Sequence, residues 1–540
     1  MKKPADGGSN PPRAIMNLRR VIAEELGIAP ELLEIPPAEI KADYALPCFK
    51  LGKRPEELKR DSELFSAEAQ GGYLNLKLNW SRLAKELLKP RRKRKLKGEL
   101  ILEHTSANPD GPLHIGHFRN SVLGDALARI LRYQGYRVNT EFYVNDMGRQ
   151  IAIAVWEWLR KQEEPKGKPD WWVVELYIRG NRRLEDNPHL EESLRHLMEL
   201  FERGDQKIRR AYRKLVQACL KGHKQTLEEL GIRIDSFRYE SDYLPEVKQV
   251  IKRLGKWIKR EGKHLWVDLK PFGIQREFTL TRADGTTIYP ARDLAYHLDK
   301  FRRAKENIAV IGWDQKFYFE QLLKTLSLLE PEAVKHYRIV FYQHLRLPEG
   351  RISTRKGSFI AIDILLQDAV QEARRIVEER MPGYPEAEKA RIAKAVGVGA
   401  LKWTMLRISP EKGCVWTSEA LRFEGATAPY VQYTYARARS VLRKSRKKPK
   451  AGSLEDPRET RCLKLLGEFE WVLEQVEKNL RPHLLANYAL ELADAFNEFY
   501  QNLPILNSEK ARERLMLTQR VAETLKLCLD LLGIEALERM

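Results

Sequence analysis

Cysteine is scarce in this chain, and long apolar runs are missing. The five cysteines are scattered, and none belongs to a Cys-x-x-Cys pair. This spacing argues against a disulfide framework and against a structural zinc site. No apolar segment approaches the roughly 20 residues of a membrane span, and the basic N-terminus lacks the apolar core of a signal peptide. We therefore expect a cytoplasmic protein without a membrane contact or a metal site of its own.

Acidic residues are outnumbered, and no internal repeat of fixed period is present. Lys and Arg total 96 against 75 Asp and Glu, a formal net charge of +21 in 540 residues. Such an excess favours a polyanionic partner, with nucleic acid ahead of a membrane surface. The length exceeds what one hydrophobic core usually supports, so about two to four domains are expected.

Hydrophobic periodicity divides the chain into three predicted domains. Residues 1–97 combine a polar tail, a small α+β region and the basic run Pro90–Lys97, which fits either a solvated linker or a phosphate contact. Residues 98–384 alternate buried strands with helices, which predicts a Rossmann-like domain with a parallel sheet and a helical insertion at about 150–255. Residues 385–540 repeat apolar positions at i, i+3 and i+4, which predicts an all-α bundle.

The strongest functional signal lies between Glu99 and Tyr133. A buried strand leads into a loop of small residues, and the sequence His-Ile-Gly-His at 114–117 stands where a helix begins. Exposed N–H groups and the positive end of the helix dipole attract phosphate at such a joint. The glycine lets a flat ligand lie against the backbone. Because the loop leaves the carboxyl end of a parallel strand, it stands where α/β sheets bind their ligands.

A second loop, RISTRKG at 351–357, combines three cations with two hydroxyl groups. These groups suit a triphosphate whose charge moves toward the leaving pyrophosphate. Either loop alone has an ordinary explanation, since an imidazole can cap a helix and a basic turn can be solvated. When both loops occur in one chain, each after a predicted strand, they are a specific indication of triphosphate binding.

The two loops resemble the signatures of the class I aminoacyl-tRNA synthetases. His-Ile-Gly-His is that family's first signature, and ISTRKG is similar to the form that its second signature, the KMSKS loop, takes in arginyl-tRNA synthetases. Other segments resemble the arginyl enzymes along nearly the whole chain, among them LEHTSANPDGPLHIGHFRNS, FYVNDMGRQIA, YPARDLAYHLDK and TAPYVQYTYARAR.

The resemblance implies an activity and its partners. Such an enzyme activates L-arginine with ATP, supplied as its Mg²⁺ complex, and transfers the arginyl group to the 3′-terminal adenosine of tRNA(Arg). The C-terminal bundle would then bind the anticodon, and residues 1–97 would contact the tRNA elbow. Activation is expected to need bound tRNA, and we expect a monomer.

The resemblance also implies roles for individual residues. ATP would be bound by His114, Gly116, His117, Ser353, Arg355 and Lys356, of which the two histidines, Arg355 and Lys356 would carry catalysis. Arginine would be held by Glu103, Ser106, Asn108, Tyr289, Asp293 and Gln315. In this pocket the carboxylates of Glu103 and Asp293 would pair with the guanidinium. tRNA would contact Tyr73, Asn75, Tyr430, Tyr433 and Arg437.

Other interpretations stay open at this level. Taken by themselves, Asp293 could be a helix cap, Tyr289 a core residue and Tyr433 a buried side chain of the bundle. Trp313 and Tyr318 depart from the family pattern beside the predicted pocket, and Arg351 and Ile352 depart from it in the second loop.

Two further classes of protein also fit parts of the sequence. One is a class I synthetase or adenylyltransferase of another specificity, which would lack the pair Glu103 and Asp293. The other is a tRNA-binding relative without activity, against which the intact His114, His117 and Lys356 argue.

Overall fold

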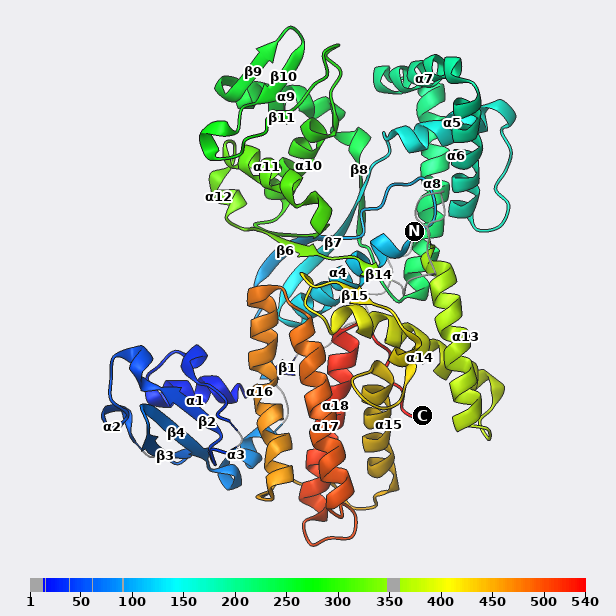
Figure 1. Ribbon diagram of the computed structural model, residues 1–540. Helices are drawn as coiled ribbons and strands as arrows, with labels where there is room; N and C mark the ends of the chain where they lie inside the picture. The colour runs from blue at the N-terminus through cyan, green and yellow to red at the C-terminus, as the bar shows by residue number, and fades with distance from the viewer. Residues whose placement is uncertain (1–12, 15, 38, 61, 90–91, 347–359) are drawn as a thin grey trace.

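The computed structural model in Figure 1 describes residues 13–14, 16–37, 39–60, 62–89, 92–346 and 360–540. The predictions for Ser353, Arg355 and Lys356, and the two departures at 351 and 352, lie outside the described residues.

A five-stranded parallel sheet stands at the centre of the molecule, in the order β13-β12-β6-β7-β8. Its strands are β6 (Gly98–Glu103), β7 (Tyr136–Val144), β8 (Ser236–Tyr239), β12 (Glu306–Gly312) and β13 (Tyr337–Tyr342). Every neighbouring pair is parallel. The chain moves from β6 to β7 on one side and later to β12 on the other, so the topological switch point lies at the carboxyl end of β6. The predicted Rossmann-like parallel sheet is confirmed.

Strand alternation gives the sheet two different faces. Leu102 of β6 and Phe142 of β7 belong to the core that contains the apolar side chains of α4. Their neighbours Glu103 and Glu141 contact α10 on the opposite face. There a second core joins α10 and α11 to β12. The covering helices are α4 (Ile115–Tyr133), α10 (Tyr289–Arg303) and α11 (Lys316–Ser327).

Four helices fill most of the predicted insertion between β7 and β8. They are α5 (Arg149–Lys161), α6 (Pro169–Asp186), α7 (Glu191–Arg203) and α8 (Gln206–Glu229), and they project to the upper right in Figure 1. The last part of the predicted range differs, because β8 is a strand of the central sheet and α9 (Leu244–Leu254) packs against α10. The pattern Ser-Phe-Arg-Tyr is too short and too mixed to indicate a strand, and only its pairing with β7 makes it one.

A small antiparallel sheet precedes α10. It has the order β11-β10-β9, with β9 (Ile258–Glu261), β10 (His264–Val267) and β11 (Phe278–Thr279).

The N-terminal unit is a small α+β structure, drawn in blue in Figure 1. Its antiparallel sheet has the order β2-β4-β3. Its elements are α1 (Leu18–Leu26), β2 (Tyr44–Pro47), α2 (Pro55–Leu58), β3 (Phe65–Gln70), β4 (Tyr73–Leu78) and α3 (Trp80–Leu87). The unit docks on α16 (Pro457–Asn479), where Arg19 Nε lies 3.2 Å from Glu468 Oε2 and both side chains are buried.

The basic run after α3 also contacts α16. Arg94 pairs with Glu470, its guanidinium lies 4.5 Å from the ring centre of Tyr133, and Lys97 Nζ lies 2.6 Å from Glu477 Oε2. The fold thus brings carboxylates of a distant helix to both cations, although the Lys97 side chain remains 37% exposed. The strand β5 (Arg92–Lys93) pairs with β1 (Arg13–Ala14).

Six long helices form the C-terminal part. They are α13 (Ile362–Arg380), α14 (Glu386–Leu406), α15 (Ala428–Lys444), α16, α17 (His483–Asn502) and α18 (Ala511–Leu531). The short strands β14 (Leu345–Arg346) and β15 (Cys414–Val415) pair where this part meets the sheet domain. All five cysteines are buried and none forms a disulfide. Within the described ranges, no helix combines the length and the apolar character needed to cross a bilayer.

Candidate functional site

A cleft of about 750 Å³ opens at the carboxyl end of the central sheet. It lies between the loop after β6, the start of α4 and the N-terminal part of α10. The predicted ATP and arginine residues that line it are Glu103, Ser106, Asn108, His114, Gly116, His117, Tyr289, Asp293 and Gln315. The structure therefore brings both predicted sets, as far as they are described, into one cavity.

The two histidines of the first loop are held by the start of α4. His114 is the N-cap, and its Nδ1 accepts a hydrogen bond from the Gly116 backbone N–H at 3.0 Å. The ring centres of His114 and His117 lie 3.8 Å apart. Burial lowers the pKa of both imidazoles, and for His117 the charge of His114 adds to the effect. Both rings are thus neutral at physiological pH. They offer polar groups to an anion although they carry no permanent charge themselves.

The His114 ring lies so close to the backbone at position 116 that only glycine fits there. A Cβ at this position would lie 2.8 Å from Cε1 of His114, a separation at which the imidazole would have to move. Its carbonyl oxygen accepts a hydrogen bond from the Tyr342 hydroxyl at 3.1 Å. The loop is therefore fixed from both sides.

The turn after β6 is strained. Thr105 and Ser106 have φ angles of 69° and 37°, which non-glycine residues rarely adopt. Asn120 of α4 holds the turn, since its Oδ1 accepts from the Thr105 N–H at 2.6 Å and its Nδ2 donates to the Val310 carbonyl at 2.7 Å. Ser106 Oγ donates to Glu103 Oε1 at 3.1 Å and accepts from the Tyr143 N–H at 3.0 Å.

Asp293 lies in the second turn of α10, at the edge of the cleft. Its Oδ2 accepts a hydrogen bond from the Tyr318 hydroxyl at 2.5 Å. Burial, and secondarily the nearby carboxylate of Glu240, raises the pKa of Asp293 to about 7. Tyr289, one turn earlier, is 49% exposed, and its ring centre lies 5.0 Å from that of Tyr318. Tyr318, which departs from the family pattern, therefore supports both predicted arginine contacts.

Glu240 is a cleft residue that sequence reasoning missed. It begins η4 (Glu240–Tyr243), directly after β8, and is almost fully buried. Its Oε1 accepts from Arg292 Nε at 2.5 Å, whereas Oε2 has no hydrogen-bond partner among the described residues. Burial raises the pKa of Glu240, against the opposing effect of Arg292. The available signal was a carboxylate at the end of a strand, and it was lost because β8 itself was not predicted.

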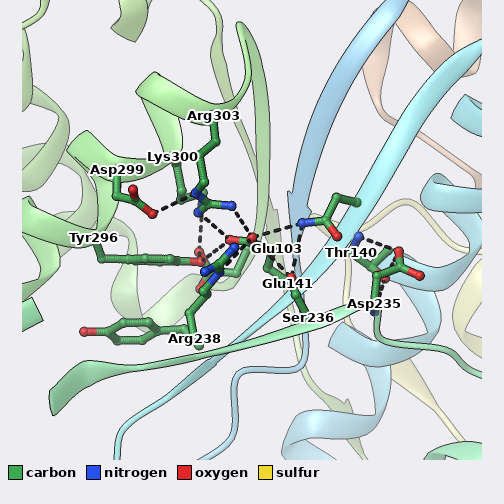
Figure 2. Close-up of polar contacts among 12 residues, drawn as sticks. Glu103, Thr140, Glu141, Asp235, Ser236, Arg238, Tyr296, Asp299, Lys300 and Arg303 are labelled. Carbon is green, nitrogen blue, oxygen red and sulfur yellow. Dashed lines mark hydrogen bonds and ion pairs between the residues drawn. The ribbon is translucent and has the colours of Figure 1, made fainter. Parts of the chain in front are cut away.

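Glu103 occupies the cleft as predicted, but its carboxylate is already paired. Its Oε2 accepts from Lys300 Nζ at 2.8 Å and from the Tyr296 hydroxyl at 3.1 Å (Figure 2). Burial would raise the pKa of Glu103, but the charge of Lys300, together with hydrogen bonds from Lys300 and Ser106, holds the pKa below the ordinary value. The remaining predicted ligands, Asn108 and Gln315, are exposed in the cleft.

The residues predicted to contact tRNA lie far from this cleft, in the terminal parts of the chain. On β4, Tyr73 packs edge-to-face against the exposed Phe49 with ring centres 5.5 Å apart. Asn75 is buried, and its Nδ2 donates to Gln70 Oε1 at 3.3 Å.

On α15, Tyr433 and Arg437 line a second cavity of about 630 Å³ together with Tyr500. The Arg437 guanidinium lies 4.8 Å from the ring centre of Tyr433. Tyr430 lies elsewhere on the helix, and its hydroxyl donates to Asp494 Oδ1 at 2.7 Å.

In the part of the chain that the structure describes, no group of three or more His, Cys, Asp or Glu side chains is arranged to hold a metal ion.

Known proteins resemble this chain in sequence and in fold. Residues 81–409 match the model of the class I tRNA synthetase (R) catalytic domain, and residues 431–540 match the DALR anticodon binding domain. The arginine–tRNA ligase of Archaeoglobus fulgidus is 42% identical over 459 residues, 82% of this chain and 82% of that protein. That of Methanocaldococcus jannaschii is 37% identical over 574 residues, 97% of this chain and 98% of that protein. The solved arginyl-tRNA synthetase of Thermus thermophilus superposes with a TM-score of 0.85 at 30% identity, covering 97% of this chain and 100% of that one.

Proposed function

Because this chain belongs to the arginyl-tRNA synthetases of class I, we propose that the cleft at the end of β6 is where it activates L-arginine with ATP. The reaction of the enzyme is the ATP-dependent joining of L-arginine to tRNA. The arginine carboxylate attacks the α-phosphorus of ATP, and pyrophosphate leaves. A ribose hydroxyl of the 3′-terminal adenosine then takes the arginyl group, and AMP leaves. Such transfers need positioning and charge stabilisation more than a nucleophilic side chain.

The observation that carries the proposed pocket is the carboxylate capacity left free on one side of the cleft. Among the described residues, Asp293 has a hydroxyl partner and no ion pair, and Glu240, which pairs with Arg292, keeps its second buried carboxylate oxygen without a partner. A planar guanidinium with five donors satisfies two such carboxylates, whereas a compact ammonium does so poorly. In this proposal Tyr289 packs on the guanidinium, and Asn108 and Gln315 bind the α-amino and carboxylate end.

ATP is proposed to lie against the first loop. The neutral rings of His114 and His117 hydrogen-bond the phosphates, Gly116 lies beneath the adenine, and Ser353, Arg355 and Lys356 of the second loop bind the triphosphate. Mg²⁺ accompanies the ATP as part of the substrate.

The tRNA is proposed to contact both terminal parts of the chain. Tyr433 and Arg437, with Tyr430, form the anticodon contact, and Tyr73 with Asn75 forms the elbow contact. In this proposal the elbow-binding domain spans residues 1–97, the catalytic domain residues 98–384 and the anticodon-binding domain residues 385–540. We propose that the enzyme acts as a monomer in the cytoplasm and activates arginine only with tRNA bound.

Charging assays with the purified full chain test the proposal. Each amino acid is offered in turn with tRNA and ATP, and L-citrulline, in which a neutral urea replaces the guanidinium, is added as a competitor. We expect charging with arginine alone and negligible inhibition by citrulline. Charging of another amino acid in place of arginine, or competition by citrulline comparable to the affinity for arginine, would contradict the pocket. Pyrophosphate exchange with and without tRNA tests the dependence of activation on tRNA.

A further inference from the structure

The helical insertion contacts the chain around the first loop at two places. At the first place, His223 Nε2 of α8 lies 2.7 Å from the Gly111 carbonyl oxygen. A carbonyl only accepts, so Nε2 carries the proton. Val174 of α6 approaches the same residue so closely that a Cβ on Gly111 would lie 2.9 Å from Cβ of Val174. The insertion therefore packs directly against the segment that leads into the first loop.

The second contact runs through the start of α13, which lies below the insertion in Figure 1. Asp363 is the second residue of α13. Its carboxylate accepts hydrogen bonds from Lys168 Nζ at 2.6 Å, from Trp171 Nε1 at 3.0 Å and from Thr226 Oγ1 at 2.7 Å. Lys168 is the N-cap of α6, Trp171 lies in its first turn, and Thr226 belongs to α8. One carboxylate thus joins three helices.

Lys168 also binds a second carboxylate. Asp170 is the second residue of α6, as Asp363 is of α13, and the positive end of a helix favours a carboxylate there. Lys168 Nζ lies 3.0 Å from Asp170 Oδ2, and neither carboxylate forms another ion pair within the described ranges. Gly222 of α8 leaves room for this arrangement, since a Cβ there would overlap Cγ of Asp170. One lysine therefore holds together two carboxylates that repel each other.

The start of α13 is bonded to the first loop through the backbone. The Ile362 N–H donates to the Leu113 carbonyl oxygen at 2.8 Å, and the Ile115 N–H donates to the Ile360 carbonyl oxygen at 3.0 Å. These two bonds lie on either side of His114. Ile115 is the first residue of α4, so its N–H has no acceptor inside that helix. A shift of α13 would therefore disturb the backbone that holds His114.

We propose that Lys168 and Asp363 are positioning residues whose ion pair holds the start of α13 on the insertion and thereby keeps His114 and His117 in place for the ATP phosphates. This inference rests on the proposed binding of ATP at the first loop. Neither Lys168 nor Asp363 lines the cleft, so both act through the backbone of α13 and not by contact with a substrate. The helical insertion gains a task in the activation step.

The contacts of Asp363 favour a single position of α13. All three groups that donate to its carboxylate belong to the insertion. If α13 moved away, Lys168 would keep Asp170, but Asp363 would lose its cation and two further hydrogen bonds. A partly buried carboxylate that loses its partners is penalised by more than the intact pair contributes. The start of α13, and with it the first loop, is thereby restricted to the arrangement in which the three helices meet.

A double-mutant cycle tests the inference with the full chain. Wild type, Lys168→Met, Asp363→Asn and the double variant are compared by aminoacylation kinetics for ATP and for arginine, and by thermal unfolding. Lys168→Met leaves two carboxylates facing each other, so we expect KM for ATP to rise by about tenfold while KM for arginine stays within about twofold. The double variant removes this repulsion and keeps an amide that can bond Trp171 and Thr226. We expect its KM for ATP to lie within about threefold of wild type.

A matched control separates positioning from a general loss of stability. Arg183→Met breaks an ion pair inside the insertion, where Arg183 Nε lies 3.0 Å from Oε2 of the buried Glu157. This pair joins α6 to α5 and does not reach α13, so we expect lower thermal stability with an unchanged KM for ATP. Three results would each overturn the inference: an unchanged KM for ATP in Lys168→Met, an equal rise in Arg183→Met, or a double variant that does not recover.

A milder variant covers the case in which Lys168→Met does not fold. Thr226→Val removes the hydroxyl that accepts from Lys168 Nζ at 2.6 Å and donates to Asp363, and we expect KM for ATP to rise by about two- to fivefold. The matched control is Thr518→Val on α18, which removes a buried hydroxyl that donates to the Arg514 carbonyl oxygen at 2.8 Å. If both variants lose similar thermal stability and neither changes KM for ATP, the positioning role is wrong.

The proposed ATP site and this inference fail in different ways. If His117→Ala charges tRNA with an unchanged KM for ATP, the proposed ATP site is wrong, whatever the cycle shows. If His117→Ala loses charging while a folded Lys168→Met keeps the wild-type KM for ATP, the ATP site stands and only the role given to Lys168 and Asp363 is refuted.

Discussion

The two sides of the cleft differ in how far their buried carboxylates are paired with cations. On the sheet side, Glu103 and Glu141 are paired with Lys300 and Arg303. On the α10 and η4 side, Asp293 has a hydroxyl partner but no ion pair among the described residues, and Glu240 pairs with Arg292 through one oxygen while its other oxygen has no partner within that part of the chain. The pKa of Glu103 lies below its ordinary value, and burial first, then Glu240, raises that of Asp293 to about 7. The paired carboxylates hold the fold, and the carboxylate of Asp293 with the second oxygen of Glu240 is where we propose that a cationic ligand binds.

The largest effect is expected at Asp293. Asp293→Ala removes the uncompensated charge, and we expect kcat/KM for arginine to fall by at least about 10³-fold, because the guanidinium then loses its main anionic partner. tRNA affinity, measured by filter binding, should stay nearly unchanged. Asp293→Asn keeps the shape and loses the charge, so it should be almost as inactive. If either variant still charges tRNA with an unchanged KM for arginine, Asp293 does not bind the guanidinium, and the proposed difference between the two sides of the cleft is wrong.

A smaller loss is expected when Glu240 becomes neutral. Glu240→Gln keeps one acceptor for Arg292 and removes the charge, so we expect KM for arginine to rise by about 10- to 100-fold. Glu246→Gln is the matched control, since Glu246 also has a buried carboxylate oxygen without a partner among the described residues but does not line the cleft. Equal kinetic effects of both changes would show that the loss is not specific to the pocket.

The pH dependence of arginine binding tests the raised pKa of Asp293. Only the ionised carboxylate pairs with a guanidinium, so kcat/KM for arginine should fall by about tenfold for each unit below pH 7. The groups that face it are Tyr143, Tyr318, Glu240 and Glu103. The pKa of Asp293 is higher in the ligand-free fold than in the unfolded chain, so folding is favoured while this carboxyl group is protonated. That contribution of Asp293 to the free energy of unfolding is present at low pH and is lost as the pH rises through about 7. Bound arginine should restore the lost stability. A profile that is flat between pH 6 and 8, with KM for ATP as the internal control, would contradict the assignment.

The smallest change in activity or binding is expected on α15. There too, one side chain is bonded within the fold and another faces a cavity. The Tyr430 hydroxyl is bonded within the bundle, whereas Tyr433 lines a cavity beside Arg437. Tyr433→Ala should weaken tRNA binding by about 1 kcal/mol, the low end for a stacked base, because Arg437 already covers part of the ring. Tyr435→Phe, a buried neighbour on the same helix, should leave the affinity unchanged. Equal affinities for Tyr433→Ala and wild type would place the RNA contact elsewhere.

Much of the architecture follows from local pattern. The central sheet is parallel as predicted, and the helix at the first loop begins where its sequence predicts. Periodicity identifies such elements because each has one buried face. The short strand β8 was missed because its four residues are all half-buried, and Glu240 was missed with it. The ion pairs of Arg94 and Lys97 could not be predicted, because their carboxylate partners lie more than 370 positions away in the chain.

The sequence by itself determined the family, the parallel sheet and the helical C-terminal part, and it predicted several residues that meet in the cleft but not Glu240. These depend on periodicity and on short motifs, which are local properties of the chain. Only the tertiary structure decided which carboxylates are available to a ligand. Glu103 and Asp293 both line the cleft, but α10 brings Lys300 to the first, whereas the second has no cation beside it among the described residues. A charge is compensated or exposed according to what the fold places within a few ångströms of it, and that distance is not a local property.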